Sequence, residues 1–148
     1  MALQIEAPLY MVGVVTPCWR CDTRMSVITL LAPHVAGADG QVCLLGEIRD
    51  VPPEILSYIQ QRVPTFRFRS SRMGGTRYLA NTCPKCRVIF GDFFLHSEPG
   101  ALFFPTSEKE AKSLYMREIP ILHPVEIEAS PGVGTGELIL ANAKRLTD

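Results

Sequence analysis

Two short stretches, Cys18-Trp19-Arg20-Cys21 and Cys83-Pro84-Lys85-Cys86, decide how this chain is expected to fold. In each stretch two residues separate the cysteines, so both sulfur atoms can point at one metal ion while backbone amides donate hydrogen bonds to the thiolates. Two such knuckles complete the tetrahedral shell that zinc prefers. The sequence therefore predicts one structural Zn²⁺ ion, with these ligands: Cys18, Cys21, Cys83 and Cys86.

The wide separation of the two knuckles makes the motif less specific than a compact ribbon. Residues 22–82 lie between the pairs, whereas paired knuckles are usually separated by roughly 15 to 20 residues. Four thiolates could also hold iron, as in an electron carrier. A redox dithiol would need a cysteine at a helix N-terminus, and neither pair obviously opens a helix. Iron, a redox dithiol and a metal-free or disulfide-bonded state are the alternatives to zinc.

The residue that follows a knuckle is often in a left-handed backbone conformation with positive φ. Asp22 follows the first knuckle and tolerates this conformation, whereas Arg87 follows the second and is less suited to it. We therefore expect an irregular backbone at Arg87.

Length and composition indicate one folded domain. The chain has 148 residues, of which 47% are hydrophobic and 20% charged, which is typical of a globular protein. A chain of this length fits one domain. We expect a single zinc-stabilised domain over residues 1–148, with knuckles at 18–21 and 83–86 and an inserted segment of about 22–82.

The cysteines and the apolar runs indicate a cytoplasmic location. Five cysteines, four of them in two pairs, favour metal binding in a reducing compartment and leave Cys43 as a core residue. No apolar run approaches the roughly 18 to 20 residues that span a bilayer, so no membrane association is expected. The segment Met1 to Pro8 has no basic residue and carries Glu6, which does not suit a secretory signal.

Hydrophobic periodicity predicts an α+β fold with a small antiparallel sheet, two or three helices and a ribbon-like zinc site of four cysteines. A helix is expected over residues 50–63, where two prolines precede an apolar pattern, and another over 107–118, which opens with a Ser107/Glu110 capping box. Residues 137–145 suit either a strand or a helix. Strands are expected at 9–15, 24–32, 41–48 and 121–129, with a hairpin formed by 65–70 and 77–81.

The segment Ala80-Asn81-Thr82-Cys83-Pro84-Lys85-Cys86, followed by Gly91-Asp92-Phe93-Phe94-Leu95-His96, resembles a group of uncharacterised bacterial zinc-ribbon-like proteins. The stretch from Cys18 to Cys21 matches their first knuckle. The likeness covers about residues 76–104 and the first knuckle. It implies a metal site and a ribbon-like fold, and it implies no activity.

A basic segment interleaved with aromatic residues covers residues 62–87. This mixture is typical of surfaces that grip phosphates and stack bases. On a strand, however, Phe66 and Phe68 would share one face and Arg67 and Arg69 the other, which argues for a solvated face or an acidic protein partner. Because Lys+Arg and Asp+Glu are 15 each, the chain has no net charge, and any charged partner must be bound by a local patch of charge. The candidate contacts are Arg67, Arg69, Arg72 and Arg77.

No catalytic set is evident in the sequence. His34, His96 and His123 are scattered, and only the Asp92/His96 pair could share one side of a helix, where a structural pair is expected. The turn Gly132–Gly136 lacks the Gly-Lys-Ser/Thr of a phosphate loop. We expect a non-enzymatic, zinc-stabilised protein that acts through a protein partner as an accessory, regulatory or toxin-neutralising module. The alternatives are a nucleic-acid-binding protein that uses the hairpin 62–78 and a thiol oxidoreductase.

Overall fold

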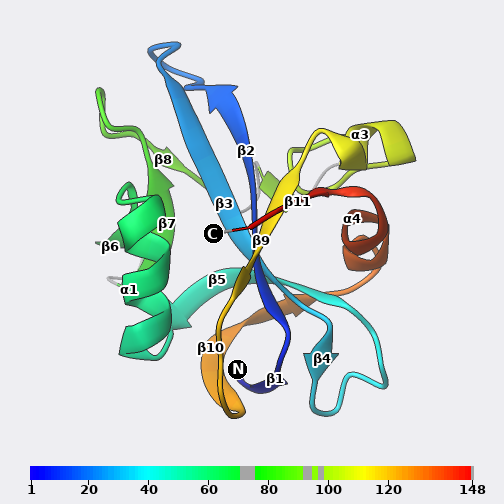
Figure 1. Cartoon of the computed structure of the whole chain (residues 1–148). Helices are drawn as coiled ribbons and strands as arrows, with labels where there is room; N and C mark the ends of the chain where they lie inside the picture. Colours follow the sequence, from blue (N-terminus) through cyan, green and yellow to red (C-terminus); the bar gives the residue numbers. More distant parts are fainter. Residues whose placement is uncertain (71–75, 92–94, 97–98, 148) are drawn as a thin grey trace.

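Two long apolar runs form the centre of the fold. The computed structural model describes residues 1–70, 76–91, 95–96 and 99–147 (Figure 1). In it, β2 (Leu9–Pro17) and β3 (Arg24–Ala32) pair as antiparallel strands, and the turn between them carries the first knuckle. The strands predicted at 9–15 and 24–32 are confirmed, as is the position of the first knuckle at the tip of their hairpin.

These two strands lie in an eight-stranded sheet of order β11-β9-β2-β3-β5-β10-β1-β4, in which β11 runs parallel to β9 and the other pairs are antiparallel. The predicted small sheet is therefore wrong. The sheet is large because strands far apart in sequence join it, such as β1 beside β10 and β2 beside β9, and periodicity does not reveal such pairs. The other strands are β1 (Ala2–Glu6), β4 (His34–Val35), β5 (Cys43–Asp50), β9 (Tyr115–Ile119), β10 (Val125–Gly132) and β11 (Lys144–Leu146).

A second sheet of order β6-β7-β8 carries the second knuckle. It consists of β6 (Phe66–Ser70), β7 (Arg77–Thr82) and β8 (Ile89–Phe90), all antiparallel. The predicted hairpin of 65–70 with 77–81 is confirmed, and the predicted turn at 73–75 lies outside the described residues. Asn81 ties β7 to the large sheet: its Oδ1 accepts from the Ile28 amide at 2.8 Å, and its Nδ2 donates to the Ile28 carbonyl at 2.9 Å.

The described part of the chain contains three helices: α1 (Pro53–Arg62), α3 (Glu108–Lys112) and α4 (Gly136–Asn142). The predicted helix over 50–63 is confirmed, and 137–145 divides into α4 and β11. The helix predicted over 107–118 is wrong beyond Lys112, because β9 follows and pairs with β2. None of these helices has the length and the apolar character that a helix needs to cross a membrane.

Both faces of the large sheet are buried along most of its central strands β2 and β3, whereas alternate residues of β1 are exposed. Along β2, Leu9 and Met11 belong to one hydrophobic cluster, while Tyr10 and Val12 belong to another, as expected when alternate side chains point to opposite faces. The first cluster includes residues of α1, and the second includes residues of α4 and Cys18 and Cys83. Figure 1 shows α1 on one side of the long strands and α3 and α4 on the other. The knuckle cysteines are thus anchored in the second cluster.

Candidate metal centre

The two knuckles have the same backbone hydrogen-bond pattern, although they belong to different sheets. In the first, the Cys18 amide donates to the Thr23 carbonyl at 2.8 Å, and the Asp22 amide donates to the Cys18 carbonyl at 3.0 Å. In the second, the Cys83 amide donates to the Val88 carbonyl at 2.9 Å, and the Arg87 amide donates to the Cys83 carbonyl at 3.0 Å. Each loop is therefore closed around its cysteine pair by the same two bonds.

A left-handed residue completes each loop. Asp22 has φ 62° and Arg87 has φ 66°, so both residues adopt the left-handed conformation, and the second knuckle is as regular as the first rather than irregular at Arg87 as predicted. Aspartate occupies this region more readily than arginine does. A non-glycine residue here costs of order 1 kcal/mol or more and persists only where the surrounding structure enforces it. The second knuckle thus adopts an unfavourable backbone to complete its loop.

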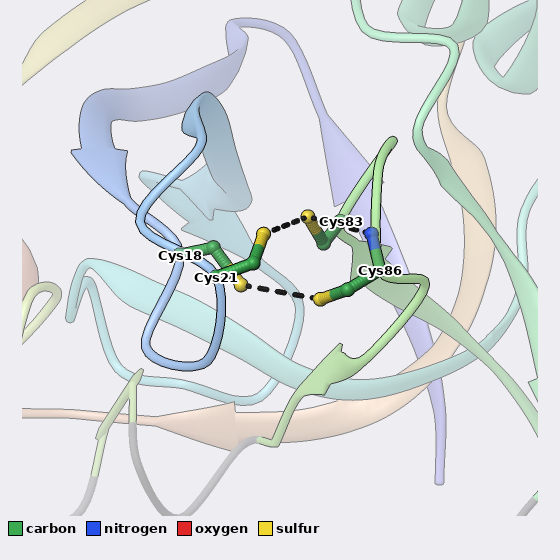
Figure 2. A group of neighbouring side chains, drawn as sticks. All are labelled: Cys18, Cys21, Cys83 and Cys86. Carbon is green, nitrogen blue, oxygen red and sulfur yellow. Dashed lines mark hydrogen bonds between the residues drawn. The ribbon is translucent and has the colours of Figure 1, made fainter.

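The four sulfur atoms meet where the two hairpin tips face each other, and Figure 2 shows the side chains pointing toward one another. All four Sγ atoms lie within 4.8 Å of one another. The Sγ atoms of Cys18 and Cys86 are 3.6 Å apart, and those of Cys21 and Cys83 are 3.5 Å apart. These distances exceed a disulfide bond of about 2.05 Å, and all four cysteines are free.

This spacing fits a tetrahedral metal ion. A zinc–sulfur bond of about 2.3 Å gives sulfur atoms roughly 3.8 Å apart at the corners of a tetrahedron. The two Sγ separations of 3.6 and 3.5 Å are close to that value, and the chemistry of four thiols suits a soft or borderline metal ion. The sequence-predicted set of Cys18, Cys21, Cys83 and Cys86 is therefore brought together and could hold a metal ion.

Hydrogen bonds around the sulfur atoms favour thiolates. The amides of Lys85 and Cys86 approach the Cys83 Sγ at 3.4 and 3.5 Å. Burial opposes ionisation of Cys83, but the amides of Cys86 and Lys85 lower its pKa. The hydroxyl and amide of Thr23 lower the pKa of Cys21 to about 6. A hydrogen bond with the Val88 backbone lowers the pKa of Cys86. Burial and the neighbouring sulfur atoms outweigh it and raise this pKa to about 11. Such a spread of pKa values is expected when four thiols share one site without a cation.

Cys43 is separate from this site. It lies at the start of β5 with no exposed surface, and burial raises its pKa. The prediction that Cys43 belongs to the core is confirmed. Neither knuckle opens a described helix, because one lies between β2 and β3 and the other between β7 and β8.

The structure separates the candidate arginines. Arg67 is exposed on β6, and Arg69 of the same face reaches the second knuckle, where its Nη1 donates to the Arg87 carbonyl at 3.2 Å. Arg77 lies on the opposite face, with its guanidinium 3.9 Å from the centre of the Phe68 ring. Phe66 is buried, so the predicted division between aromatic and arginine faces is confirmed. Arg72 lies outside the described residues.

Trp19 is a surface residue that the sequence motif presents only as a spacer between two cysteines. Its side chain is 57% exposed, and its Nε1 donates to the Ile89 carbonyl at 3.4 Å, which holds the indole beside β8. Its exposure could have been predicted from its position between two knuckle cysteines, because residues at a knuckle tip point away from the core.

The remaining candidates do not join this site. His34 and His123 are exposed, and His96 packs against Phe103 with ring centroids 5.5 Å apart. Asp92, the predicted companion of His96, lies outside the described residues. The turn Gly132–Gly136 lies at the end of β10 and borders a pocket that is separate from the cysteines.

Comparison of the chain with protein-family models, with curated proteins and with solved structures found no match. Function is therefore inferred from the cysteine site and from the surface around it.

Proposed function

We propose that this protein is a non-enzymatic, zinc-stabilised binding module that recognises an acidic segment of a partner protein. Four thiolates fill the shell of a zinc ion and leave no position for water or substrate, so the metal has a structural role. The knuckles join two sheets within one domain, in the manner of a ribbon with a long insertion. The same site could hold iron, and metal analysis distinguishes the two.

The observation that carries this proposal is the one-sided charge around the knuckles. Every charged side chain in residues 55–91 is basic. Because the knuckles face each other, exposed residues of both loops surround one site, and Arg69 reaches it from β6. Asp22 is the acidic residue of these loops. We call the following set the basic surface: Arg20, Arg67, Arg69, Lys85 and Arg87.

We favour an acidic peptide over single-stranded nucleic acid as the partner of this surface. Arg67 and Arg69 project from one face of β6, whereas Arg77 is stacked on Phe68 on the other, so the surface presents guanidinium groups with few aromatic neighbours. Arginine pairs with carboxylates through two parallel hydrogen bonds, which gives geometric specificity as well as attraction. The exposed Trp19 favours a second candidate, single-stranded nucleic acid, since an indole can stack on a base.

A binding assay with the metal-loaded chain tests the proposal. Trp19 is the single tryptophan, so its fluorescence reports on binding beside the knuckles. A ten-residue glutamate peptide is expected to bind in a salt-sensitive manner, and Arg67→Glu with Arg69→Glu should weaken binding about tenfold or more. The double reversal Lys109→Glu with Lys112→Glu on α3 changes the net charge by the same amount as the arginine double variant and should leave affinity near that of the parent.

Two results would contradict the protein-partner proposal. A ten-residue thymidine oligonucleotide that binds more tightly than the peptide and quenches Trp19 would replace it with single-stranded nucleic acid. Equal losses in the two double variants would show that net charge, not the basic surface, governs binding.

A further inference from the structure

A pocket of about 440 Å³ lies away from the cysteines, between β5, the end of β10 and the segment that carries His96. Its volume is within the range of roughly 300 to 1,000 Å³ found for small-molecule sites. The pocket gathers two features that the metal site leaves unused, His96 and the glycine-rich turn after β10. It also contains Glu47, which no sequence motif singles out.

The backbone at Glu47 is distorted in a way that places this residue at the pocket. Glu47 has φ 45°, in the left-handed region, although it lies inside β5. The pairing of β5 with β10 shifts there, from Glu128 opposite Asp50 to Ser130 opposite Gly46, so β5 bulges. Bulges re-aim side chains and are frequent beside functional sites, where such strain is retained.

The side chains around the pocket select the charge of a ligand. Glu47 supplies a carboxylate, His96 an imidazole, and Thr135 a hydroxyl, while Phe103, Phe104 and Leu44 form an apolar wall. No lysine or arginine is among the described residues that line the pocket. An anion would therefore meet a like charge, whereas a cation would meet a carboxylate and aromatic rings.

Arg49 is one cation that competes for the Glu47 carboxylate. Its Nη2 lies 3.8 Å from Glu47 Oε2, with side-chain exposures of 47% and 58%. Exposed pairs at this distance contribute little, so a cation in the pocket can compete for the same carboxylate.

We propose that this pocket binds a small organic amine. The protonated nitrogen pairs with the Glu47 carboxylate, and an apolar body packs against Phe103 and Leu44. This site is independent of the basic surface, which lies around the knuckles.

Three probes of one shape test the proposal with the full metal-loaded chain: 2-phenylethylamine, 2-phenylethanol and phenylacetate. Amide chemical shifts of Gly46, Val133 and Thr135 follow occupancy of the pocket. The amine is expected to bind about tenfold more tightly than the alcohol, and Glu47→Gln should remove that difference. The matched variant Glu137→Gln, at an exposed residue of α4, should keep it.

The proposal is overturned if the three probes bind equally, if phenylacetate binds best, or if no probe saturates these shifts at millimolar concentration. It is also overturned if Glu47→Gln, checked for an unchanged fold by its spectrum, retains the preference for the amine.

Discussion

At the scale of single residues, the side chain of Asn81 takes the place of a neighbouring strand beside Ile28 of β3. β3 pairs with β5 from Leu30 to Ala32, and β5 then bulges away at Glu47. The amide and carbonyl of Ile28 point to the same side, as in any antiparallel strand, and they meet the carboxamide of Asn81. Because a side-chain amide carries both a donor and an acceptor, one residue satisfies both groups.

We expect Asn81→Leu to destabilise the fold strongly. Leucine has nearly the same size but leaves the Ile28 amide and carbonyl buried without partners, at about 1–3 kcal/mol for each group. Urea denaturation should therefore show a loss of at least about 2 kcal/mol in the free energy of unfolding. In the control Asn142→Leu, a half-exposed side chain that donates to the Leu138 carbonyl is lost. A loss in Asn81→Leu no larger than in this control would contradict the assigned role.

At the scale of elements, the region after Ser107 shows how much of the secondary structure can be predicted from the sequence. The predicted capping box is present, since the Ser107 hydroxyl accepts from the Glu110 amide at 3.2 Å. The helix nevertheless ends at Lys112, and Tyr115 to Ile119 form a strand beside β2. Apolar residues at 111, 114, 116 and 119 suit a helix face or a buried strand, and pairing with a strand about a hundred residues away decides between them.

The helix α4 is packed closely against the start of β5 through Gly136. A Cβ atom on this residue would lie 2.8 Å from the Val42 carbonyl oxygen and from Val42 Cγ1. Since a backbone atom cannot move aside, Gly136→Ala should destabilise the protein by about 1–3 kcal/mol. A thermal melt measures the loss. Gly91→Ala, where a Cβ atom would meet nothing within 4 Å, is the matched control and should melt near the parent temperature.

At the scale of the whole molecule, the cysteine site joins the two sheets. Cys18 and Cys21 come from the hairpin of β2 and β3, and Cys83 and Cys86 come from the turn between β7 and β8. The candidate ligands were predictable because each knuckle is a local motif whose chemistry does not depend on tertiary structure. The pocket at Glu47 was not predictable, because it depends on a shift in strand register that no local pattern encodes.

Elemental analysis of the native chain should find one zinc ion per molecule. The Cys86→Ser variant should lose the metal, and its melting temperature should be roughly 10 °C lower than that of the parent. Removing the metal from the parent with a chelator should have the same effect. Cys43→Ala removes a cysteine that lies outside the site and should retain the metal. Iron in the native chain would change the assigned cofactor, and a metal-free chain of full stability would remove the structural role.

The wide spacing of the knuckles also bears on how the protein is made. On a ribosome, Cys18 and Cys21 leave the exit tunnel well before Cys83 and Cys86, since residues 22–82 must be translated in between. At about 5–20 residues per second this delay is roughly 3 to 12 s. During that interval the nascent chain exposes half of a ligand set, and the ion can be fully enclosed only after β7 has docked. Completion of a four-cysteine metal site would thus be a late event in the biogenesis of this molecule.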